Sequence, residues 1–350
     1  RVLVAIYRRH DVAQGRTVPG GIYLSTDGGV HFARTFEHAA SDLAQDPSSP
    51  DVVFAAFGVD GGCTTCSSPG GVWRSADFGL TFSPALTHAS PGAPFAVQPG
   101  QVKLTVSRTS PAVLYASVLD GDDAHEAAGV FRSGDGGLTW EKRTAPAQAC
   151  PKSADNQCSY DHALLVHPAR PDRLWLGTVN LYVSDDGAAT WRTLVEVYAR
   201  GSQLHPDQHA FAVPSTEPST LWVGNDGGLY RSTDGGASFE SRNDTLGLVQ
   251  FNGVALHPAI PAFLMGGTQD NGNLRTLDGV SWSDRTGSDG GFVLVRQDDP
   301  AQVLAANYYA YLNYSSTTGG GFREVTSPQL MTSDGEPAEP MAFYPPAAAA

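Results

Sequence analysis

The chain has 350 residues, and its 36 acidic against 22 basic side chains give a net charge of −14. Such a charge argues against nucleic acid and anionic membrane surfaces as partners. No apolar run approaches a membrane span and no helical period of useful length is present, so the sequence indicates an all-β protein.

The first predicted strand is the apolar run from Val2 to Ile6, and a later strand leads into a tight turn. That turn carries the signature Ser25-Thr26-Asp27-Gly28-Gly29-Val30-His31-Phe32. In such a turn Ser and Asp can bond backbone N–H groups that a strand ladder leaves free, and the glycines allow positive φ angles. The closing aromatic residue returns the chain to the core.

The same signature recurs along the whole chain. Its seven copies end at Phe32, Phe82, Trp140, Trp191, Phe239, Trp282 and Phe322. The copy at Trp282 is one residue shorter, and the last copy has Thr317 where aspartate is expected. Spacings of 40 to 58 residues suit one four-stranded sheet per copy, which is the period of a β-propeller blade.

Five of the repeats also contain a Pro-rich corner, such as Asp46-Pro47 to Pro50, followed by a β-rich run. We therefore order a blade as inner strand, corner, second strand, third strand, signature turn and outer strand. Six inner strands are expected to begin near Asp42, Val102, Asp161, Gln208, Asn252 and Phe292. The first blade has none, and Met341 to Tyr344 could fill that gap and close the ring. The alternative is that the ends are truncated and more blades follow.

These elements predict one seven-bladed ring over residues 1–346, with residues 347–350 as a tail without pattern. The expected blades are 1–38 plus 340–346, 39–88, 101–145, 160–198, 207–245, 250–286 and 290–326.

The repeated signature resembles the Asp-box, or BNR-repeat, β-propellers, which include sialidases, tandem-propeller xyloglucan hydrolases, the sortilin luminal domain and photosystem assembly factors. The resemblance covers nearly the whole chain and implies architecture more than activity. In that family the boxes lie on the face opposite the active site. The resemblance therefore implies a structural role for the box aspartates Asp27, Asp77, Asp135, Asp186 and Asp234.

The four cysteines form two close pairs, Cys63 with Cys66 and Cys150 with Cys158, each in a polar loop. Local disulfides are the plain interpretation, and they imply export to an extracellular or periplasmic location. A zinc site made by all four, or a redox dithiol at the first pair, is the weaker alternative. No signal-peptide pattern precedes the first strand, so we expect a mature product or an excised part of one.

Polar residues gather near the predicted tops of the inner strands and in neighbouring loops, where they should converge on the channel mouth. The candidate catalytic carboxylates are Asp161, Asp207, Asp226, Asp270 and Asp289, and the candidate ligand-binding residues are Tyr160, His162, His209, Asn225, Gln269 and Asn271. A divalent cation such as calcium could be held by Asp161, Asp207, His209, Asp226 and Asp270. The competing interpretation is that Asp and Asn at these positions only cap turns.

The residues expected at the channel mouth suggest two possible functions. The first is a binding module or scaffold for a carbohydrate or a partner protein. The second is a glycoside hydrolase of the tandem-propeller, xyloglucanase-like type, which needs two carboxylates across a sugar cleft. A sialidase would need an arginine triad, and no Arg-Ile-Pro motif is present.

Overall fold

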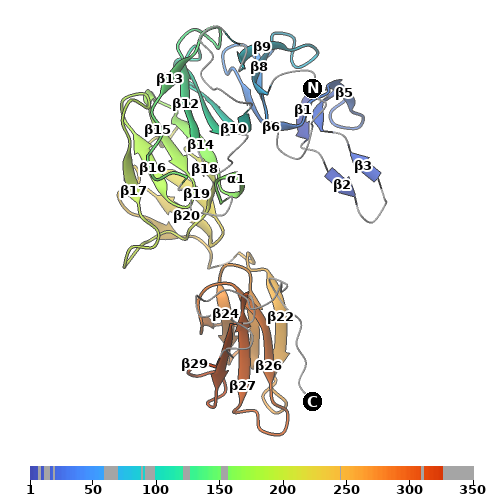
Figure 1. Cartoon of the computed structure of the whole chain (residues 1–350), viewed down its shortest axis with the longest axis vertical. Helices are drawn as coiled ribbons and strands as arrows, with labels where there is room; N and C mark the ends of the chain where they lie inside the picture. The colour runs from blue at the N-terminus through green and yellow to red at the C-terminus, as the bar shows by residue number, and fades with distance from the viewer. Residues whose placement is uncertain are drawn as a thin grey trace. The chain divides into compact units, whose positions relative to one another are not determined.

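The computed structural model describes residues 1–6, 9–11, 16–18, 20–58, 70–87, 90, 99–120, 127–150, 157–244, 246–308 and 311–325. The chain divides into two compact units, Arg1–Asp244 and Thr245–Ala350, which are considered separately. Each is built from antiparallel sheets whose strands follow one another in chain order (Figure 1). Among the described residues, no helix combines the length and apolar character needed to cross a membrane.

The first unit contains five such sheets. The first and second sheets consist of β1 (Val2–Ile6), β4 (Gly21–Ser25) and β5 (Ala33–Phe36), and of β6 (Ala40–Gln45), β7 (Val53–Phe57), β8 (Gly71–Ser75) and β9 (Ser83–Thr87). The third sheet consists of β10 (Pro99–Val106), β11 (Leu114–Asp120), β12 (Ala127–Ser133) and β13 (Glu141–Arg143). The fourth and fifth sheets consist of β14 (Ala163–His167), β15 (Arg170–Gly177), β16 (Leu181–Ser184) and β17 (Arg192–Val195), and of β18 (Gln208–Ala212), β19 (Leu221–Asn225), β20 (Gly228–Ser232) and β21 (Glu240–Ser241). A hairpin of β2 (Arg9–Asp11) and β3 (Arg16–Val18) is inserted in the first sheet, and the short helix α1 (Gln157–Tyr160) precedes the fourth.

The second unit contains two four-stranded sheets. They are β22 (Phe251–Leu256), β23 (Leu264–Thr268), β24 (Gly272–Thr276) and β25 (Trp282–Asp284); and β26 (Gly290–Val295), β27 (Val303–Asn307), β28 (Leu312–Ser315) and β29 (Arg323–Glu324). All seven sheets have the up-and-down order of a propeller blade, so the all-β, seven-bladed prediction is supported.

Among the described residues, the first sheet consists of three strands, β1, β4 and β5. The other six inner strands begin within three residues of the predicted positions. Met341 to Tyr344, the segment expected to complete the ring, lies outside the described residues. Ring closure therefore stays a prediction.

The core of the first unit lies between neighbouring sheets. Phe54 and Val72 of the second sheet pack with Val102 and Phe131 of the third in one buried apolar cluster. The middle strands carry this packing, and all five residues of β7 are buried, which explains its continuous apolar sequence. The first strands β6, β10, β14 and β18 adjoin one another in succession, so their ends bring residues of different sheets together.

Candidate functional site

The signature turns join the third strand to the fourth and are closed by their own side chains. In the third copy the Ser133 hydroxyl donates to Asp135 Oδ1 at 2.8 Å, and the Gly137 N–H donates to Ser133 Oγ at 2.9 Å. The N–H groups of Leu138 and Thr139 donate to Asp135 Oδ1 at 3.1 and 2.9 Å. These bonds leave the carboxylate fully engaged in its turn, which supports the structural role expected for it.

The other copies repeat this arrangement with small changes. Asp27, Asp77, Asp186 and Asp234 each accept their serine hydroxyl at 2.7 to 2.8 Å. In the shortened copy, Thr276 takes the place of serine and donates to Asp278 Oδ1 at 3.0 Å. In the last copy the Thr317 hydroxyl accepts the Gly321 N–H at 3.2 Å, so a hydroxyl oxygen partly replaces the missing carboxylate.

Three carboxylates gather at one edge of the fourth and fifth sheets. Asp161 follows α1 and leads into β14, while Asp207 directly precedes β18. Gln208 pairs with Asn225 in the β18–β19 register, which places Asp226 at the same end as Asp207. Because β14 and β18 adjoin, three of the five predicted catalytic candidates share one neighbourhood.

The buried Asp161 carboxyl lies beside the partly buried carboxyl of Asp207. Asp161 is fully buried, and no donor among the described residues satisfies its two carboxyl oxygens. Burial, then the Asp207 carboxyl beside it, and finally the charge of Asp226 raise the pKa of Asp161 to about 9. The raised pKa favours the protonated, neutral form of the Asp161 carboxyl.

Asp226, His209 and Tyr160, here called the Tyr160 group, lie beside this pair. His209 Nε2 lies 2.6 Å from Asp226 Oδ1, and the Tyr160 hydroxyl donates to Asp226 Oδ2 at 3.1 Å. The Tyr160 and His209 rings meet edge to face with centroids 4.8 Å apart. The hydrogen bond to Asp226 raises the pKa of His209 against the opposing effect of burial.

The Tyr160 group is open to solvent on one side. Tyr160 is 56% exposed, although its hydroxyl and ring are both held. The His209 side chain is 32% exposed, whereas that of Asp226 is only 8% exposed. The Tyr160 ring and the His209 imidazole are thus available to a ligand, and the nearly buried Asp226 carboxylate holds both side chains in position.

Asn225 and Gln208 support the loop that carries Asp207. Asn225 Nδ2 donates to the His205 carbonyl at 3.1 Å and to Gln208 Oε1 at 3.2 Å, while Gln208 Nε2 donates to the His205 carbonyl at 2.7 Å. A Cβ at Gly227 would lie 2.4 Å from that of His205, so the sequence Asn225-Asp226-Gly227-Gly228 needs glycine here. Asn225 was predicted to bind ligand, and these bonds favour a supporting role. The sequence placed Gln208 at the start of an inner strand but did not indicate its bond to the His205 carbonyl, and no motif marks His205.

His162 is directed into the protein instead of toward the Tyr160 group. It is 3% exposed, with Nδ1 3.1 Å from Gln101 Oε1 and Nε2 2.8 Å from Ser117 Oγ. Burial lowers the pKa of His162 to about 3, so the ring is neutral. With both nitrogens engaged, its geometry favours joining the third and fourth sheets over binding a ligand.

The remaining candidates lie in the second unit and form a separate group. Gln269 Nε2 donates to Asp270 Oδ1 at 3.0 Å and to Asp289 Oδ1 at 2.9 Å. The Asp270 N–H also donates to Asp289 Oδ1 at 3.1 Å, and Asn271 Nδ2 donates to the Gln269 carbonyl at 3.0 Å. These bonds join the β23–β24 turn, which carries Gln269, Asp270 and Asn271, to Asp289 at the start of β26 in the next sheet.

No three His, Cys, Asp or Glu side chains among the described residues are grouped so that they could hold a metal ion. The five-residue cation site expected from the sequence is therefore not assembled as one set in the described part of either unit. A calcium or other divalent-cation site remains an expectation from the sequence.

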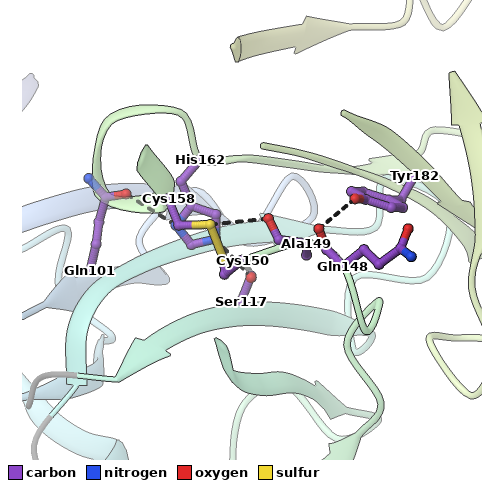
Figure 2. The surroundings of a disulfide bond; sticks show 8 residues. All are labelled: Gln101, Ser117, Gln148, Ala149, Cys150, Cys158, His162 and Tyr182. Atoms are coloured by element: carbon purple, nitrogen blue, oxygen red, sulfur yellow. Dashed lines mark hydrogen bonds between the residues drawn. A yellow bond between two sulfur atoms is a disulfide. The ribbon is translucent and has the colours of Figure 1, made fainter. Parts of the chain in front are cut away.

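The second predicted disulfide is present. Cys150 and Cys158 are bonded, with their Cα atoms 5.7 Å apart. Figure 2 shows the bond next to His162, with Tyr182 farther away beside Gln148. Cys63 and Cys66 lie outside the described residues, so the first predicted disulfide stays a prediction.

Comparison with known proteins gives partial matches. No protein-family model matches the sequence. An oligoxyloglucan-reducing end-specific xyloglucanase of Emericella nidulans is 32% identical over 124 residues, which are 33% of this chain and 14% of the relative. A probable enzyme of the same description from Neosartorya fischeri is 34% identical over 124 residues, or 32% of this chain and 14% of the relative. The chain thus matches only a small part of each relative's length.

Solved structures that align with this chain include a GH74 xyloglucanase and YCF48. The GH74 xyloglucanase of Xanthomonas campestris aligns over 85% of this chain and 49% of its own, with 16% identity and a TM-score of 0.44. YCF48 from Cyanidioschyzon merolae aligns over 82% of this chain and 84% of its own, with 12% identity and a TM-score of 0.39.

Proposed function

We propose that this chain is an exported Asp-box propeller that binds a carbohydrate through the Tyr160 group. One observation carries the proposal: Tyr160 is 56% exposed, while its hydroxyl is bonded to Asp226 and its ring packs against His209. A fixed ring offers apolar area to the face of a sugar and loses little further entropy on binding. The partly exposed His209 imidazole lies beside it as a partner for a sugar hydroxyl, and the nearly buried Asp226 carboxylate holds both residues in position.

The ligand class proposed is a xyloglucan-type oligosaccharide. Its support is the match between one third of this chain and xyloglucanases. Export is supported by the Cys150–Cys158 disulfide, since such bonds persist in oxidising compartments. The hydrogen bonds between Ser and Asp in the signature turns support assigning these turns to the Asp-box type.

The binding proposal is tested by calorimetric titration with xyloglucan, xylan and cello-oligosaccharides. We expect Tyr160→Ala to abolish binding while the melting temperature stays within a few degrees of wild type. Tyr198→Ala is the matched control, because Tyr198 is also an exposed tyrosine, at 77%, and should leave binding intact. Undiminished affinity in Tyr160→Ala, or no binding to any oligosaccharide, would refute the proposal and favour a protein partner for this face.

Glycoside hydrolysis is the second candidate, and the carboxyl pair favours it. Asp161, whose pKa is raised, lies beside a second carboxyl group, Asp207, and a carboxyl group of raised pKa can act as the general acid in glycoside cleavage. Full burial of Asp161 argues against direct contact with a sugar, which is why binding is preferred here. Release of reducing ends from xyloglucan that is lost in a folded Asp207→Asn variant would reverse this preference.

A further inference from the structure

We propose that the Cys150–Cys158 disulfide is a positioning device for the Tyr160 group, and that reducing it weakens ligand binding without unfolding the sheets. The binding part of this inference rests on the proposed function. The positioning part concerns the geometry of the chain alone and can be tested separately.

The chain on the Cys150 side of the bond is anchored in the fourth sheet. The Tyr182 hydroxyl donates to the Gln148 carbonyl at 2.8 Å, and Figure 2 shows this bond crossing from the β16 tyrosine to the backbone before Cys150. Ala149 is 1% exposed and packs with Leu176 and Tyr182 in a small buried cluster. This side is held by the sheet whether or not the disulfide is closed.

The chain on the other side carries the candidate site. Cys158 lies in α1, a helix of four residues, which is too short to be stable by itself in water. Cys158 is 2% exposed, and its Sγ lies 3.1 Å from the Ala149 carbonyl oxygen. Two residues later Tyr160 reaches Asp226 and His209 of the fifth sheet, and Asp161 then meets Asp207. The disulfide thus ties a weak helix, and the residues directly after it, to an anchored segment.

The two cysteines differ in exposure. Cys150 is partly exposed, whereas Cys158 is buried. A thiolate of a small dithiol can attack Cys150 Sγ, breaking the S–S bond and releasing Cys158 as a thiolate that takes up a proton. The second thiol of the reductant then attacks the mixed disulfide, so that the dithiol is oxidised and both cysteines become thiols. The tie to α1 is then lost, while the Tyr182 anchor remains.

The test compares a Cys150→Ser/Cys158→Ser double variant with wild type. A Cys63→Ser/Cys66→Ser double variant is the matched control, because it removes the other cysteine pair. The first readout is hydrogen exchange by mass spectrometry. We expect faster exchange in residues 157–162 of the Cys150/Cys158 variant, with β15, β16 and β19 as protected as in wild type. Unchanged exchange in residues 157–162 would overturn the positioning role.

The second readout is oligosaccharide affinity. We expect a loss of roughly 3- to 10-fold in the Cys150/Cys158 variant, the range expected when one contact side chain must be ordered on binding. Reduction of wild type with a dithiol should produce the same loss, and reoxidation should restore it. Unchanged affinity despite faster exchange would show that the disulfide does not serve binding. If no oligosaccharide binds any form, the proposed function fails while the exchange result still decides the positioning role.

Discussion

Asp186 shows how a single carboxylate closes a tight turn. Its Oδ1 accepts the Thr190 N–H at 2.9 Å and its Oδ2 accepts the Thr190 hydroxyl at 2.6 Å. These bonds favour the ionised form and hold the pKa of Asp186 below its usual range. The neighbouring Asp185 instead makes an ion pair with Arg173 at 3.0 Å. Two adjacent aspartates therefore have different tasks in one turn.

Replacing these two residues in turn separates the tasks. We expect Asp186→Ala to lower the free energy of unfolding by about 1–2 kcal/mol, because it leaves the backbone donors of the turn without an acceptor. Asp185→Ala should cost about 0–1 kcal/mol, as for other surface ion pairs. Urea unfolding of both variants measures the difference. Equal losses would show that the signature aspartate has no special structural role.

Asp161 leads to a prediction about pH. Its pKa is raised to about 9 in the folded protein from an ordinary 3.8, so the folded state holds a proton that the unfolded chain has released. Wild-type stability should therefore fall as the pH rises through this window. Asp161→Asn keeps the site neutral, and its amide can donate to Asp207. We expect the variant to melt above wild type at pH 8 and to lose this advantage toward pH 5.

The control for this experiment is Asp172→Asn, which changes an exposed carboxylate and should leave the pH profile parallel to wild type. A lower melting temperature of Asp161→Asn at pH 8 would mean that the pair requires its charge. That outcome would favour a bound cation at Asp161 and Asp207 over a shared proton.

At the scale of strands, polar side chains join neighbouring sheets through their first strands. Asp42 in β6 accepts the Leu104 N–H of β10 at 2.8 Å and the N–H of Leu43 at 2.8 Å. Ser41 donates to the Val102 carbonyl at 2.9 Å, and the Val166 N–H of β14 donates to Thr105 Oγ1 of β10 at 3.1 Å. Buried polar groups thus link three successive sheets.

Removal of one such link should be costly. We expect Asp42→Ala to lower the free energy of unfolding by about 1–3 kcal/mol, because the buried Leu104 N–H loses its partner. Gln45→Ala, on the exposed end of the same strand, is the control and should change little. Chemical denaturation measures both. A neutral Asp42→Ala would indicate that water replaces the carboxylate.

The strands and turns could be predicted well from the sequence, because they depend on local patterns repeated seven times. The functional neighbourhood was harder. Asp161, Asp207 and Asp226 could be selected because each stands at a strand end, but burial of Asp161 depends on how two sheets pack. The inward direction of His162 depends on Gln101 and Ser117, which are distant in sequence. The β2–β3 hairpin was not predicted either, since its residues carry no alternating apolar pattern.

For the whole molecule, the question that follows is whether Met341 to Tyr344 adds a strand to the first sheet. We predict that deleting residues 340–350 lowers the melting temperature by several degrees, because Met341 to Tyr344 would pair with β1. Deleting only residues 347–350 is the control and should have no effect. Identical melting curves for all three forms would mean that this segment does not complete the first sheet.

The backbone bonds between corners and signature turns have a consequence for how such a chain can change over generations. Gly136 donates to the Ala112 carbonyl at 2.9 Å, Gly187 to Asp172 at 2.8 Å and Gly235 to Ser219 at 2.8 Å. In each case donor and acceptor belong to the same repeat, so a duplicated repeat contains both the donor and the acceptor of this hydrogen bond. Duplication or loss of a whole repeat would therefore disturb these hydrogen bonds less than an insertion that separates a corner from its turn. Substitutions such as Thr317 in place of aspartate could then accumulate in individual copies while the other copies keep the Ser–Asp hydrogen bonds of the signature turn.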